Sequence, residues 1–125
     1  MTYLVFASEE DVDWQAGQRG LAEVLLRDWP DAEIQDPTPA DAEVDGRGLR
    51  WICHIGGHEI EAWLNKQGTC LYIDGEFEAA AEVASWFRGH MLREVEFSIC
   101  DDVYSFQVGI EYEASAREIV ESVPD

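Results

Sequence analysis

The chain has 125 residues, 46% hydrophobic and 11% aromatic, which suits one folded domain with its own apolar core. Its 27 acidic and 8 basic residues give a formal net charge of −19, and the excess of acid runs along the whole sequence. Phosphate groups repel such a surface, so the charge argues against direct binding to nucleic acid or to an anionic membrane. A basic protein partner would be attracted, although solubility or a salty cytoplasm would explain the acidity equally well.

The start of the chain, MTYLVFASEEDVD, predicts neither a signal peptide nor a membrane span, because it has no basic segment and its apolar run is short. Cys53, Cys70 and Cys100 have no paired spacing and lie in strand-like segments. We therefore expect free thiols in a cytoplasmic protein.

The first third of the chain predicts a strand, a helix, a second strand and a loop. In the first strand Tyr3 and Val5 share one side. Leu4 and Phe6 share the other side. A stripe of apolar residues at helical spacing, ended by Pro30, predicts the helix. The predicted ranges are 2–7 for the first strand, 18–28 for the helix, 32–36 for the second strand and 37–48 for a surface loop rich in Pro, Asp and Gly.

The middle of the chain predicts a three-strand antiparallel meander. Gly56 and Gly57 separate two alternating segments, and two glycines supply the positive φ angles that a type I′ hairpin turn requires. A second turn over residues 65–68 returns the third strand. The first hairpin pairs Leu49 with Leu64, Trp51 with Ala62, Cys53 with Ile60 and Ile55 with His58. These residues, His58 excepted, form one apolar face together with Leu71 and Ile73 of the third strand.

The remainder of the chain predicts a helix, two strands and a short helix. Apolar residues at helical spacing predict the first helix, with Gly89 as its C-cap. Strict alternation predicts both strands. Ser115 and Glu118 match a capping box for the last helix. The predicted ranges are 76–89 for the first helix, 95–99 and 104–112 for the strands and 115–123 for the last helix.

This order of elements predicts a single α+β domain over residues 1–125. We expect a largely antiparallel sheet with the meander at its centre, two main helices on one face and a short C-terminal helix. Because two helices cover one face of such a sheet, the other face would be open to water or to a partner.

The segment CHIGGHE, residues 53–59, contains potential metal ligands, but its geometry argues against a metal site. Alternation directs His54 to one face of the hairpin and Cys53 and His58 to the other. The chain also lacks the common catalytic motifs. We therefore expect no enzyme, no metal and no cofactor. A small enzyme or ligand-binding domain built around His54 and Glu59 remains an alternative.

The opposite face of the meander is the candidate binding site. It combines aromatic and aliphatic side chains with carboxylates, as protein interfaces do, although a wet sheet surface with an ordinary cation–π pair between Arg50 and Trp63 is the simpler interpretation. We name it the outward meander face, and its residues are Arg50, Ile52, His54, Glu59, Glu61, Trp63 and Tyr72.

The C-terminal third of the chain resembles the small immunity proteins of bacterial polymorphic toxin systems. The resemblance rests on AxWFRGHM from Ala84, EVEFSICDDVYSFQVGIEY to Tyr112 and the closing SAREIVESV. It implies a tryptophan-bearing helix, a strand ending in an acidic turn, a further strand and a short helix. It also implies a cytoplasmic inhibitor that binds a toxin domain, often through acidic residues when the toxin is a basic nuclease. The family shares no catalytic residues, so none is carried over.

The sequence thus predicts a non-enzymatic acidic binding protein with a basic protein partner, in the manner of an immunity protein. One alternative is a DNA mimic, which would block a nucleic-acid-binding protein with rows of carboxylates. A second alternative is the small enzyme or ligand-binding domain built around His54 and Glu59. A domain whose acidity is only a solvent adaptation is the last.

Overall fold

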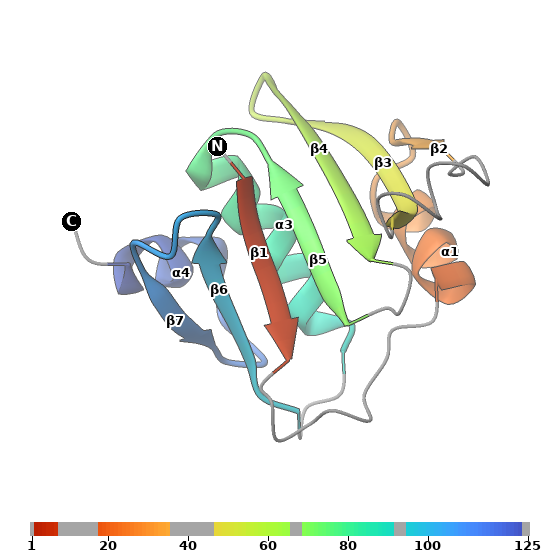
Figure 1. Ribbon diagram of the computed structural model, residues 1–125. Helices are drawn as coiled ribbons and strands as arrows, with labels where there is room; N and C mark the ends of the chain where they lie inside the picture. Colours follow the sequence, from red (N-terminus) through yellow and green to blue (C-terminus); the bar gives the residue numbers. More distant parts are fainter. Residues whose placement is uncertain (1, 8–17, 36–46, 66–68, 92–94, 124–125) are drawn as a thin grey trace.

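The computed structural model describes residues 2–7, 18–35, 47–65, 69–91 and 95–123 of the chain. These residues form seven strands and three helices in the predicted order (Figure 1). The strands are β1 (Thr2–Ala7), β2 (Glu33–Gln35), β3 (Arg47–Ile55), β4 (His58–Asn65), β5 (Cys70–Asp74), β6 (Phe97–Asp101) and β7 (Gln107–Ile110). The helices are α1 (Gln18–Asp28), α3 (Phe77–Gly89) and α4 (Ala116–Ser122).

The seven strands form one antiparallel sheet in the order β2-β3-β4-β5-β1-β6-β7. In Figure 1 all three helices lie behind this sheet, with α3 across the central strands, α1 toward β3 and α4 toward β6 and β7. The predicted α+β fold with helices on one face is therefore confirmed. None of the helices in the described residues is long and apolar enough to cross a membrane.

The meander has the predicted register. Gly56 and Gly57 have φ angles of 58° and 83°, as a type I′ turn requires. Trp51 pairs with Ala62, and the pairing continues as predicted to the turn. One detail differs, because the register shifts between Arg47 and Arg50 and interrupts the expected pair of Leu49 with Leu64.

The helix-facing side of the sheet holds the core. Of the apolar meander face that the sequence predicts, all residues are buried except Ile55, which is half-buried. Trp51 is 0% exposed. Small residues of α3, such as Ala80 and Ala84, allow the helix to approach the sheet closely, and Phe87 fills the space beside them. No helix of the described residues covers the other side of the sheet.

The predicted helix ends are only partly correct. Both Ser115 and Glu118 make the capping box of α4, as expected. At the start of α3 the carboxylate of Glu76 accepts the backbone N–H groups of Glu78 and Ala79, both at 3.0 Å. These bonds lower the pKa of Glu76. Gly89, however, is the last helical residue and not a positive-φ cap.

The last predicted strand is too long. Alternation predicts residues 104–112, yet β7 covers only Gln107–Ile110, because Tyr104 has a φ of 55° and belongs to a tight turn. The second strand is also shorter than predicted, and β3 takes up residues 47–48 of the expected loop. Residues 37–46 of that loop and 66–68 of the second meander turn lie outside the described residues.

Candidate functional site

The structure places all seven residues of the outward meander face on the side of the sheet opposite the helices. In register, Arg50 pairs with Trp63, Ile52 with Glu61 and His54 with Glu59 across β3 and β4, while Tyr72 of β5 pairs with Trp63. Side chains alternate along each strand, and the neighbouring positions in these strands are the core residues described above. The sequence alone therefore predicted correctly which residues share this face.

An aromatic stack lies at the centre of the outward meander face. The rings of Trp63 and Tyr72 are parallel within 6°, and their centroids are 5.3 Å apart. Both side chains are half-buried, so part of each ring is exposed to water. Burial raises the pKa of the Tyr72 phenol. A rigid, partly exposed aromatic pair of this kind is typical of the residues that contribute most to protein interfaces.

Charged groups lie on the β3 and β4 side of the stack. The guanidinium of Arg50 lies 2.9 Å from the carboxylate of Glu61, so among the described side chains Arg50 pairs with a carboxylate and not with the ring of Trp63. Nearer the hairpin turn, His54 Nε2 lies 3.9 Å from Glu59 Oε1, and the two side chains are 65% and 70% exposed. This second pair is at the outer limit of an ion pair and is well hydrated.

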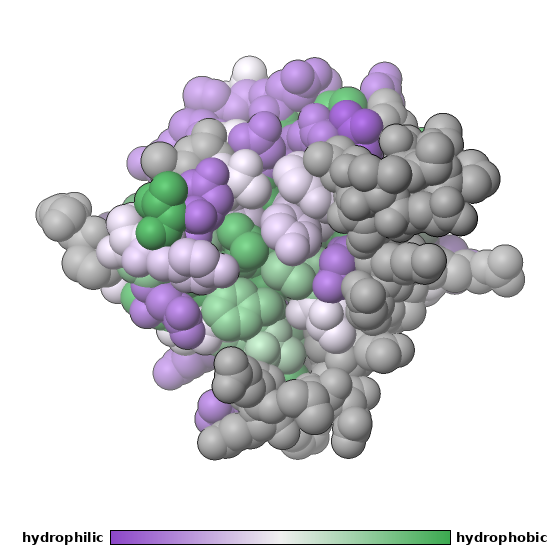
Figure 2. Space-filling model, in the orientation of Figure 1, coloured by the Kyte–Doolittle hydropathy of each residue, from purple (hydrophilic) through white to green (hydrophobic). Residues whose placement is uncertain are grey.

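The structure adds β1 to this face, which sequence reasoning did not do. Leu4 pairs with Tyr72, and Phe6 pairs with Cys70. Both apolar side chains are half-buried and lie on the outward side of the sheet. Their alternation with Tyr3 and Val5 indicated an outward side, but nothing local indicated that β1 would lie next to β5. Figure 2 shows hydrophobic residues over the middle of the sheet, with mainly hydrophilic residues above them in this view.

The potential metal ligands of CHIGGHE diverge as predicted. Cys53 is buried on the helix side of β3, whereas His54 is exposed on the outward side. Burial also raises the pKa of the Cys53 thiol to about 11, so little nucleophilic thiolate forms there at neutral pH. The Cys70 thiol is similarly raised to about 11. Within the described residues no group of three or more His, Cys, Asp or Glu side chains is arranged to hold a metal ion.

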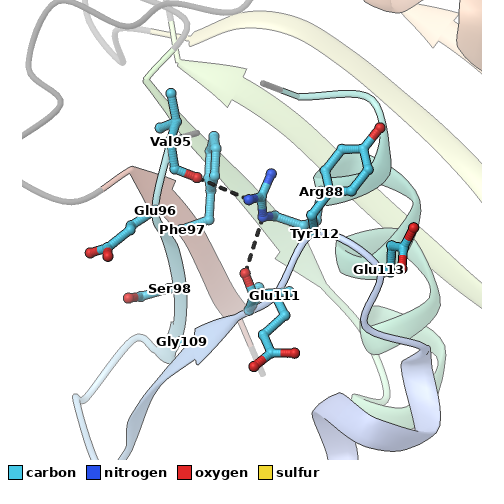
Figure 3. A pocket seen from close by; sticks show the side chains of 10 residues that line it. Arg88, Val95, Glu96, Phe97, Ser98, Gly109, Glu111, Tyr112 and Glu113 are labelled. Carbon is cyan, nitrogen blue, oxygen red and sulfur yellow. Dashed lines mark hydrogen bonds between the residues drawn. The ribbon is translucent and has the colours of Figure 1, made fainter. Parts of the chain in front are cut away.

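A hollow of about 630 Å³ lies at the other end of the sheet, around Arg88 (Figure 3). The Arg88 guanidinium is buried and donates to the backbone carbonyl oxygens of Ile110 at 3.0 Å and Val95 at 2.9 Å. It also lies against the rings of Phe97 and Tyr112. Arg88 therefore ties α3 to β7 and to the start of β6. In Figure 3 the carboxylates of Glu96 and Glu111, which also line the hollow, point away from the guanidinium of Arg88. We interpret this arginine as a structural residue.

Fold and site together define an α+β domain in which one sheet face, not covered by any described helix, has an aromatic stack with apolar residues of β1 on one side and ion-paired residues of β3 and β4 on the other. Comparisons with protein-family models, with curated proteins and with solved structures gave no match.

Proposed function

We propose that this chain is a non-enzymatic binding protein whose outward meander face docks a basic protein partner, as a cytoplasmic immunity protein docks a bacterial toxin domain. The observation that carries the proposal is the half-buried Trp63–Tyr72 stack on the sheet face opposite the described helices. A rigid aromatic pair contributes large contact area at low entropic cost when a partner covers it. The resemblance of the C-terminal third to immunity proteins points to the same kind of partner.

The charge of the surface supports a basic partner. Each arginine whose side chain the structure describes is engaged, because Arg88 is buried and the others pair with neighbouring carboxylates. The pairs are Arg27–Asp28 at 3.1 Å, Arg50–Glu61 at 2.9 Å and Arg117–Glu121 at 3.0 Å. The formal charge of −19 already includes these arginines, and those on the surface are each matched by a neighbouring carboxylate. A positively charged protein would be steered toward it.

The composition of the face favours a protein partner over mimicry of DNA. A mimic needs carboxylates in rows at phosphate-like spacing, whereas here Glu61 is next to Ile52 in register and Trp63 is next to Tyr72. An apolar centre with a charged rim is the usual arrangement of a protein–protein interface.

The test is kinetic. A partner is first isolated by affinity capture from cells that encode the chain, and the purified partner is then used for surface-binding kinetics. Trp63→Ala should raise the dissociation rate by roughly tenfold or more, because it removes a desolvated anchor. The double change Glu59→Gln with Glu61→Gln should mainly lower the association rate, roughly three- to tenfold at low salt, and the effect should fade as salt is added.

A matched control is Glu23→Gln with Glu82→Gln, which removes two charges from exposed positions on α1 and α3, on the helix side. This variant should change the salt dependence of association less than the sheet-face variant does. Circular dichroism establishes that each variant is folded. If both sheet-face variants bind with unchanged rates, the partner does not use this face and the proposal is wrong.

A further inference from the structure

The turn between β6 and β7 presents two large apolar side chains to solvent. Val103 is 70% exposed and Tyr104 is 68% exposed, more than any other large hydrophobic residue that the structure describes. Exposed apolar residues are common singly, but two adjacent ones at the tip of a turn form a patch that a partner is able to cover.

Hydrogen bonds hold this turn in place. The carboxylate of Asp101 is buried and accepts the backbone N–H of Ser105 at 2.7 Å as well as the Ser105 hydroxyl. The backbone N–H of Tyr104 donates to the carbonyl oxygen of Asp101 at 3.2 Å. Next to it, the N–H of Asp102 donates to the carbonyl oxygen of Thr2 in β1 at 3.0 Å. The exposed side chains are therefore carried on an ordered turn, anchored to two strands.

Tyr104 occupies a backbone conformation that suits a different residue. Its φ of 55° makes it the one non-glycine residue with a positive φ in the described part of the chain. Glycine or asparagine adopts this conformation with less strain than an aromatic residue does. The strained position nevertheless carries a tyrosine whose ring is mostly in water. Strain of this kind is concentrated at functional sites, where a particular side chain is needed.

The turn lies close to the outward meander face. β1 separates β5 from β6, and Leu4 pairs with Tyr72 on one side and with Cys100 on the other. Two residues after Cys100 the turn begins. Tyr104 follows a strand two places from β5 in the sheet. Burial and then Cys70 raise the pKa of Tyr72, and the phenol of Tyr104 adds to their effect. A partner seated on Trp63 and Tyr72 would thus meet Tyr104 as well.

We infer that Val103 and Tyr104 form a second anchor of the interface, inserting into an apolar pocket of the basic protein that covers the outward meander face. The inference rests on the proposed function and extends it to β6 and β7. Asp102, exposed beside the two apolar residues, matches a partner whose pocket has a basic rim.

The experiment first locates the contact. The full chain is prepared with p-benzoylphenylalanine at position 104, at position 63 or at position 26, and each form is irradiated in a lysate of cells that encode it. Leu26 is the matched control, because it is an exposed apolar residue of α1 on the helix side. The inference predicts that the same basic protein is cross-linked from positions 104 and 63 but not from 26.

The purified cross-linked protein then serves as the probe for Tyr104→Gly. This change relieves the backbone strain and removes the ring, so the urea midpoint of unfolding should stay the same or rise while the affinity falls roughly tenfold or more. A purely structural Tyr104 would give the opposite pattern, with a lower midpoint and unchanged affinity. Leu26→Ser should leave the affinity unchanged.

The outcomes separate the two proposals. Cross-linking from position 63 without cross-linking from 104, or unchanged affinity in Tyr104→Gly, overturns the second anchor and leaves the proposed function intact. Cross-linking from neither position, or to an acidic protein, overturns both.

Discussion

The indole N–H of Trp86 in α3 donates a hydrogen bond of 2.7 Å to the carboxylate of Asp28, the last residue of α1. The same carboxylate oxygen lies 3.2 Å from Nε2 of His90, and the ring of Trp86 packs on Trp29 with centroids 4.9 Å apart. These contacts join two helices that are far apart in sequence and hold them on the same face of the sheet. Both helices therefore lie on the face of the sheet opposite the outward meander face.

The Trp86–Asp28 bond predicts a pH-dependent contribution to stability. Bonds from Arg27 and then from Trp86 lower the pKa of Asp28 below its ordinary value of 3.8. A carboxyl group whose pKa is lower in the folded state than in the unfolded state stabilises the fold fully at pH values above its unfolded-state pKa. This stabilisation is lost as the pH falls through its folded-state pKa. Trp86→Phe keeps an aromatic ring but has no N–H. We expect its urea midpoint to be below that of the parent at pH 7, with a difference that shrinks below about pH 4.

Trp29→Phe is the matched control for this prediction, since it makes the same chemical change beside Asp28 at a tryptophan with no described hydrogen bond to that carboxylate. Its effect on the midpoint should vary less with pH. A difference for Trp86→Phe that is constant from pH 7 to pH 2.5 would show that the hydrogen bond to Asp28 makes no contribution of its own.

Trp51→Ala should destabilise the fold by about 3–5 kcal/mol, because a fully buried aromatic ring leaves a cavity when it is truncated. Trp51 is 0% exposed, and its ring meets that of Trp86 edge-on at 6.1 Å. Trp63→Ala makes the same change on the open face of the sheet and should cost less free energy of unfolding. Urea titration followed by circular dichroism measures both. A loss below about 1 kcal/mol for Trp51→Ala is incompatible with the observed core.

Replacing glycine by alanine should have opposite effects on the free energy of unfolding at Gly57 and at Gly20. Gly57 has a φ of 83° in the β3–β4 turn, whereas Gly20 lies in α1 without a positive φ, and neither position has an atom within 4 Å of an added Cβ. Gly57→Ala should lower the free energy of unfolding by about 1 kcal/mol or more through backbone strain. Gly20→Ala should raise it by about 0.5–1 kcal/mol, because alanine favours a helix interior. Urea titration measures the midpoint of unfolding of both variants. Midpoint shifts of equal sign would contradict the assigned turn.

Local chemistry made much of the fold predictable. The glycine pair at 56–57 set the hairpin turn, and strict alternation on either side then determined which residues face the core. Ser115 and Glu118 identified the start of α4 for a similar reason, since a capping box satisfies backbone N–H groups within one turn. The grouping of the outward meander face followed from the same period of two.

Alternation was misleading at Tyr104. The residues from 104 to 112 alternate as a strand does, but the buried carboxylate of Asp101 binds Ser105 and closes a turn at that point. The pairing of β1 with β6 also places Asp101 opposite Tyr3, where it is buried. The competing signal was therefore local, an aspartate whose side chain binds a residue four positions on, and it outweighed the alternation.

The sequence by itself determined the elements, their order, the meander register and the acidic charge, since each depends on residues that are close together in the chain. The tertiary structure decided which strands and helices lie next to each other. Pairing of β1 with both β5 and β6 brought Leu4 next to Tyr72, and the contacts of Trp86 placed both long helices on one side. Strand order and helix placement depend on the packing of whole faces against each other, so the aromatic face bordered by the turn at Tyr104 emerges only in the folded chain.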